Sequence, residues 1–72
     1  MFTRIIDFVR YRGHLIEVRV ERTLGGEITC GFVAPGGADC QPVVGLGSFD
    51  NAGRALTAVK EWVADWAVRS YG

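Results

Sequence analysis

Residues 51–71, the last third of the chain, carry the feature that most restricts the fold. At 100° per residue their apolar side chains fall on one arc and their charged side chains roughly opposite, the pattern of an amphipathic helix. The apolar arc comprises Ala52, Ala55, Leu56, Val59, Trp62, Val63, Trp66 and Ala67, and the charged side Arg54, Glu61, Asp65 and Arg69. We expect this to be the only helix, and its two tryptophans need a sheet to cover them.

Residues 15–22 show the clearest strand pattern upstream of that helix. Ile16, Val18 and Val20 alternate with charged residues, the period of two that gives a strand one dry face. The alternation resumes further on, where one side of a second strand is made up of Ile28, Cys30, Phe32 and Ala34.

Two further strands are expected at the two ends of this region. Residues 2–10 are rich in β-branched and aromatic residues, which favour extended structure, and Gly13 suits a tight turn after them. Their apolar residues fall on both faces, so the inward face of this strand stays open. A short edge strand is expected at residues 43–46, although Gly45 and Gly47 weaken it.

The connections carry ordinary turn and capping residues. Residues 35–42 contain prolines and glycines that predict an exposed loop. Ser48, Asp50 and Asn51 can each cap a helix N-terminus, which places the helix start to within about two residues.

These segments predict an α+β fold, an antiparallel sheet of three to four strands with one C-terminal helix packed on one face. The 72 residues form a single domain, residues 1–72. A domain of this size buries only about 60% of the surface that its unfolded chain exposes, so its core is small. We predict that this core consists of Ile16, Val18, Val20, Ile28, Cys30, Phe32, Leu56, Val59, Trp62, Val63 and Trp66.

The balance of charge limits the classes of partner. Eight basic and eight acidic residues give a net charge of zero, so no long-range field gathers nucleic acid or an anionic membrane. No apolar run approaches the roughly 20 residues of a membrane helix. Arg4, Asp7 and Arg10 interrupt the N-terminal segment, which therefore lacks the apolar stretch of a signal peptide. We expect a cytoplasmic protein without a membrane partner, with Cys30 and Cys40 reduced.

No combination of residues predicts catalysis or metal binding. His14 is the only histidine, and no serine or cysteine is placed by the sequence for it to activate. Cys30 and Cys40 stand ten positions apart, whereas structural zinc sites usually draw their ligands in close pairs. We therefore expect no catalytic residue and no metal site, and the protein is not expected to be an enzyme.

Cofactor binding is not expected either. The glycine-rich residues 45–48 lead into the helix N-terminus, a place where backbone N–H groups can hold an anion. No Gly-Lys-Ser/Thr sequence follows, and the carboxylate of Asp50 would repel phosphate.

Trp62 and Trp66 are the main candidates for binding a partner. They stand one helical turn apart, and the simplest interpretation is that both are core residues. Together with Leu56, Val59 and several phenylalanines they exceed what one thin layer hides, so an exposed apolar strip is an alternative. We predict that Trp62, Trp66 and Arg69, which lies in the last helical turn, bind another protein or a second copy in a homodimer.

Nucleic-acid binding by the arginine-bearing face of the sheet is the alternative function. Such a basic and aromatic surface follows a phosphate backbone. Glu17 and Glu21 alternate with Arg19, and pairing between acidic and basic residues explains the arginines without a ligand. The residues of this alternative site are Arg10, Tyr11, Arg12, Arg19 and Arg22.

The sequence resembles a diffuse group of short, uncharacterised bacterial proteins at both ends of the predicted domain. Tyr11-Arg12-Gly13-His14-Leu15-Ile16-Glu17-Val18 is similar to the hairpin that opens them, and Ser48-Phe49, Ala55 and Trp62 or Trp66 to their closing helix. The chain departs from the group at Gly53 and Arg54, where an acidic pair is usual. The resemblance implies the same fold and no reaction.

A second resemblance is to HicB-type antitoxins, in which strands and a Pro-Gly loop lead into a helix through Gly-Asp-Thr. Gly47-Ser48-Phe49 takes that place here. This resemblance implies a small RNA-attacking toxin as the partner. The residues themselves favour a more general prediction, a small non-enzymatic protein-interaction or regulatory module.

Overall fold

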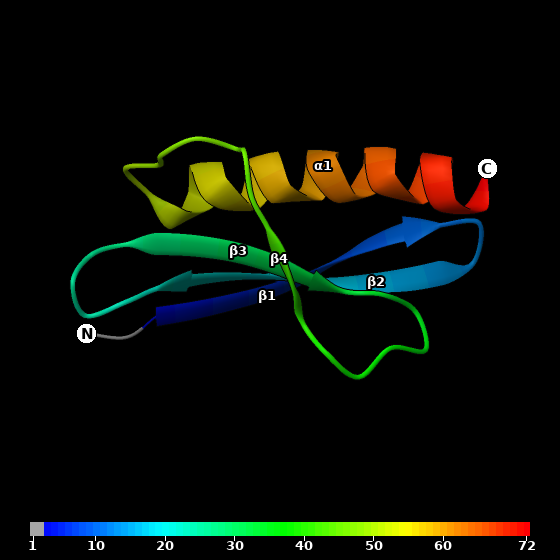
Figure 1. Ribbon diagram of the computed structural model, residues 1–72, viewed down its shortest axis with the longest axis horizontal. Helices are drawn as coiled ribbons and strands as arrows, with labels where there is room; N and C mark the ends of the chain where they lie inside the picture. Colours follow the sequence, from blue (N-terminus) through cyan, green and yellow to red (C-terminus); the bar gives the residue numbers. More distant parts are fainter. Residues whose placement is uncertain (1–2) are drawn as a thin grey trace.

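The computed structural model describes residues 3–72 as one sheet with one helix across it. The elements in chain order are β1 (Thr3–Tyr11), β2 (His14–Arg22), β3 (Ile28–Val33), β4 (Gln41–Val43) and α1 (Ala52–Tyr71). The sheet is antiparallel, its strand order follows the chain order, and α1 lies along one of its faces (Figure 1). The predicted fold class is confirmed. Phe2, which we expected in the first strand, lies outside the described residues.

A two-residue turn sets the register of β1 against β2. Tyr11 pairs with His14, and Arg12 and Gly13 between them both have positive φ, at 48° and 81°. Positive φ at both central residues is the geometry that fits the right-handed twist of a hairpin. The turn places the odd residues of β1 on the same face as the even residues of β2.

Asn51 fixes the start of α1. Its side chain accepts a hydrogen bond of 2.8 Å from the backbone N–H of Arg54, which satisfies one of the free donors of the first turn. Arg22, at the end of β2, donates a hydrogen bond of 3.2 Å from Nη2 to the carbonyl oxygen of Asp50. The helix therefore begins within the interval expected from the sequence.

The core lies between α1 and the inner face of the sheet. Ala55, Val59, Val63 and Ala67, spaced four residues apart, are the buried residues of α1, and the helix packs across β1, β2 and β3. Of the predicted core, six residues are fully buried, namely Ile16, Val18, Val20, Phe32, Val59 and Val63. The other five, Ile28, Cys30, Leu56, Trp62 and Trp66, are only partly buried, whereas Val43, Ala55 and Ala67 are buried and were not predicted.

Candidate docking surface

In the part of the chain that the structure describes, one face of the sheet has no helix packed over its first two strands. Figure 1 shows α1 on one side of the sheet, and the burial of β1 and β2 alternates accordingly. Ile5, Val9 and the even residues of β2 face α1, so the residues that alternate with them along each strand point the other way. This open face carries Arg4, Ile6, Phe8 and Arg10 from β1 and Leu15, Glu17, Arg19 and Glu21 from β2.

Three large apolar side chains are exposed together on the open face. Ile6, Phe8 and Leu15 are 48%, 46% and 52% exposed. Phe8 pairs with Glu17 and Arg10 with Leu15, so Phe8 and Leu15 are diagonal neighbours across the two strands. We call Ile6, Phe8, Arg10 and Leu15 the open-face patch. The other exposed large apolar residues of the described chain, Leu24, Val44 and Val68, lie in a turn, in a connecting segment and on α1.

The charges beside the patch are largely paired. Arg4 Nε lies 3.2 Å from Glu21 Oε1, and Arg19 pairs through Nε with Glu17. The Glu17 carboxylate raises the pKa of Arg19 above its usual value. Among residues 3–72, Arg10 forms no ion pair, so it is the free cation of the open face.

Asp7 interrupts the free edge of β1. In a hairpin with a two-residue turn, the residues that flank the turn exchange ladder hydrogen bonds, so the even residues of β1 direct their N–H groups away from β2. The N–H of Phe8 donates a 2.8 Å hydrogen bond to Asp7 Oδ1, and Lys60 Nζ of α1 lies 3.0 Å from Asp7 Oδ2. A charge on the inward face of an edge strand, such as Asp7, is a recognised device against pairing with another chain.

Asp7→Asn should remove a pH-dependent part of the stability. The N–H of Phe8 and then Lys60 hold the pKa of Asp7 below its usual value of 3.8. A lowered pKa stabilises the fold above the unfolded value and loses that contribution as pH falls through the folded pKa. We expect wild type to exceed Asp7→Asn in free energy of unfolding at pH 6, measured by urea denaturation. The difference should vanish in acid, and a difference that is independent of pH would contradict this account.

The structure does not place the residues of the alternative nucleic-acid site on one face of the sheet, and nucleic-acid binding by them stays a prediction. Arg10 and Arg19 lie on the open face, whereas Tyr11 and Arg22 belong to the opposite parity and face α1. Arg12 lies in the turn, 5.5 Å above the ring of Tyr11. The physical reason is the period of two, because residues 10, 11 and 12 cannot share a face of one strand.

The side chains of Trp62 and Trp66 pack over β3 and are partly buried. The ring of Phe32 lies 5.6 Å from Trp62 and 4.8 Å from Trp66, measured between centroids. Tyr71 contacts Trp66 edge-on and stacks on His14 at 4.4 Å, which ties the end of α1 to the start of β2. Arg69 is exposed in the last helical turn. That these tryptophans and Arg69 bind a partner stays a prediction.

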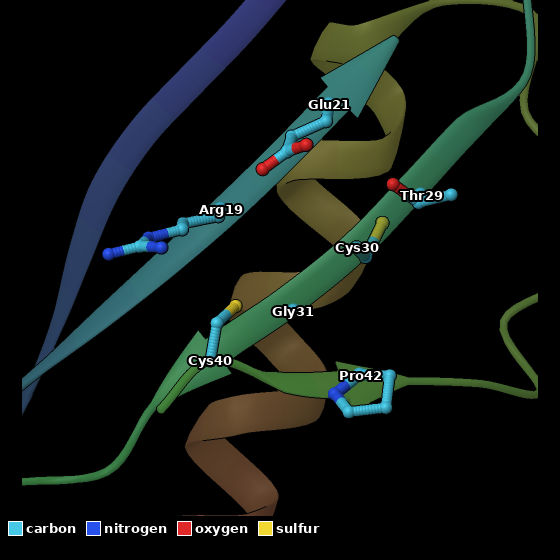
Figure 2. Close-up of a pocket in the computed structure, with 7 residues that line it drawn as sticks. All are labelled: Arg19, Glu21, Thr29, Cys30, Gly31, Cys40 and Pro42. Carbon is cyan, nitrogen blue, oxygen red and sulfur yellow. The ribbon is translucent and has the colours of Figure 1, made fainter. Parts of the chain in front are cut away.

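Two hollows lie along β3 and β4. The first, of about 200 Å³, is lined by residues that Figure 2 labels, with the Cys40 sulfur lying over Gly31 and Arg19 and Glu21 beside it. The second, of about 300 Å³, lies between the β3–β4 edge and the segment that leads to α1. Pockets for small molecules usually measure about 300–1,000 Å³, so the first hollow is smaller than a typical ligand site and the second only reaches the lower bound.

The two cysteines are separate free thiols. Cys30 belongs to the face of β3 that α1 covers, and partial burial raises the pKa of its thiol. Cys40 is exposed, and both cysteines are among the residues that line the first hollow. The two thiols are not joined by a disulfide.

Within residues 3–72, no three acidic, histidine or cysteine side chains gather closely enough to hold a metal ion. The helix of the described chain is not apolar enough to cross a membrane. No protein-family model, curated protein or solved structure matches the chain. The resemblances to short bacterial proteins and to HicB-type antitoxins therefore stay predictions, and the argument for function depends on the surface itself.

Sequence reasoning missed the open-face patch. Ile6 and Phe8 belong to the strand whose inward face the alternation left open, and Leu15 stands beside the clear apolar positions of β2. A signal was available, because the Tyr-Arg-Gly-His turn fixes the pairing of Tyr11 with His14. From that pair, Ile6 and Phe8 follow as residues of the open face.

Proposed function

We propose that this protein is a small non-enzymatic interaction module that docks another protein on the open-face patch. The observation that carries the proposal is the grouping of Ile6, Phe8 and Leu15, each about half exposed, on the face of the sheet opposite α1. Contiguous exposed apolar surface bordered by charge is typical of interaction sites. The proposal places the protein in the cytoplasm, where the free thiols of Cys30 and Cys40 stay reduced.

The free energy gained by covering the open-face patch favours a protein partner. Full burial of a large apolar side chain stabilises by about 1.5–3 kcal/mol, so covering three half-exposed ones contributes roughly 2–4 kcal/mol. A contribution of this size suits the centre of an interface, where a few residues usually supply most of the binding energy. Contacts around the patch must supply the rest. Nucleic acid is a less favoured partner than protein, because the charges of β2 are paired and the net charge is zero.

Phe8→Ser should abolish partner capture without unfolding the protein, because the Phe8 side chain is 46% exposed on the open face. Val68→Ser is the matched control, since Val68 is 52% exposed but lies on α1. Both variants and wild type would be immobilised, incubated with lysate of the native cells, and compared by quantitative mass spectrometry. Circular dichroism would establish that each variant is folded. If Phe8→Ser retains every protein that wild type captures, the patch is not the docking site.

A further inference from the structure

We infer that the element docking on the open-face patch is an amphipathic helix of a partner protein, with an acidic residue facing Arg10. This inference rests on the proposed function and names the chemistry of the partner. Three independent features of β1 support it: the spacing of its exposed side chains, the blocked backbone edge, and the unpaired charge at one end.

The spacing of the patch fits a helix. Ile6, Phe8 and Arg10 are alternate residues of one strand, so their side chains follow one another at about 6.6–6.8 Å. Residues four apart on a helix follow one another at about 6 Å. The inner face of the same sheet already packs a helix in this way, through Ala55, Val59, Val63 and Ala67 of α1. A partner helix along β1 would place two apolar residues, four positions apart, over Ile6 and Phe8. The residue four positions further along that helix would lie over Arg10.

The blocked edge disfavours an added strand. An extended peptide pairing with β1 needs its outward N–H groups, and that of Phe8 already donates to Asp7 Oδ1 at 2.8 Å. Pairing of two copies through their β1 edges also meets Arg4 and Arg10, two cations on the same exposed side of this strand. A partner therefore contacts the side chains of the patch and does not pair with the backbone of β1.

The charges specify an acidic partner. Arg10 forms no ion pair among residues 3–72, whereas Glu17 and Glu21 are both paired. A carboxylate of the partner above Arg10 would be attracted to an unpaired cation, whereas a lysine of the partner there would be repelled by a like charge. Two open faces packed together would bury the charged side chains of β2 against each other, and removing them from water is costly.

Charge-swapped peptides test the inference. The probe is an 18-residue alanine-based helix with leucines four residues apart and a glutamate four residues further, and its control carries lysine in place of that glutamate. Amide NMR titrations would follow both peptides against wild type and Arg10→Glu. We expect shifts at residues 6–10 and 15–17 and a preference for the acidic peptide of about twofold to fivefold, the size of an exposed charge pair. Arg10→Glu should reverse the preference.

Several outcomes would overturn the inference. These are absence of binding by both peptides, equal binding of both, or shifts confined to the flank around Trp62 and Trp66. Sedimentation of the protein alone, and titration with single-stranded and duplex oligonucleotides, complete the test. A dimer that Phe8→Ser dissociates, or salt-sensitive oligonucleotide shifts at the patch, would replace the helix with another occupant. The capture experiment with Phe8→Ser is independent, so the proposed function survives or fails separately.

Discussion

Phe32→Ala should cost about 3–5 kcal/mol, the usual range for removing a large buried ring. Phe32 is 2% exposed, and its ring lies beneath both tryptophans of α1. Its removal takes away their packing partner and leaves a cavity between β3 and α1. Because domains as small as this are stable by only several kcal/mol, much of the variant should be unfolded at 25 °C. Urea denaturation followed by tryptophan fluorescence measures the loss.

Phe8→Ala is the matched control for that prediction. It makes the same change on the open face, where the side chain is 46% exposed, so the loss should stay below about 1 kcal/mol. Equal destabilisation by the two variants would mean that the open face is covered in solution. That result would contradict both the description of the core and the exposure of the patch.

Gly31→Ala should destabilise the protein by about 1–3 kcal/mol, the usual cost of forcing an extra methyl group into a packed site. A Cβ at position 31 would lie 2.7 Å from Cys40 Sγ and 2.9 Å from the carbonyl oxygen of Gln41. The sulfur can rotate away, but the carbonyl belongs to β4, so the edge strand itself must move. Thermal unfolding by circular dichroism measures the effect.

Gly25→Ala controls for the loss of glycine. A Cβ there would approach nothing closer than 3.8 Å, so its effect should be small. Adding Cys40→Ala to Gly31→Ala should restore only part of the stability, because the backbone contact remains. Full restoration would show that the sulfur alone opposes the methyl group.

Each element could be predicted as far as its apolar residues are regularly spaced in the sequence. β2 was predictable because one face is aliphatic and the other charged, and α1 because its apolar arc is continuous. The face of β1 was not, because Ile6 and Phe8 are apolar residues on the exposed side while Asp7 is a charge on the covered side. Hydrophobicity therefore does not mark the buried face of this strand.

The candidate site was less predictable than the fold. The arginines were grouped by residue type, but the strand period places Arg10 and Arg22 on opposite faces. The tryptophans were predicted to bind a partner because they are large and apolar, but the ring of Phe32 packs against both and covers part of each. The patch depends on a register that residue type alone does not reveal.

The strand order also bears on how the protein folds. Each strand pairs with the one that precedes it in the chain, so assembling the sheet closes only short loops. Pairing between chain neighbours costs little loop entropy and is associated with fast folding. The helix α1 contacts β1, β2 and β3, so its packing depends on strands that lie well upstream of it in the chain. All residues of the open-face patch belong to β1 and β2, so a nascent chain contains the complete patch before it contains α1.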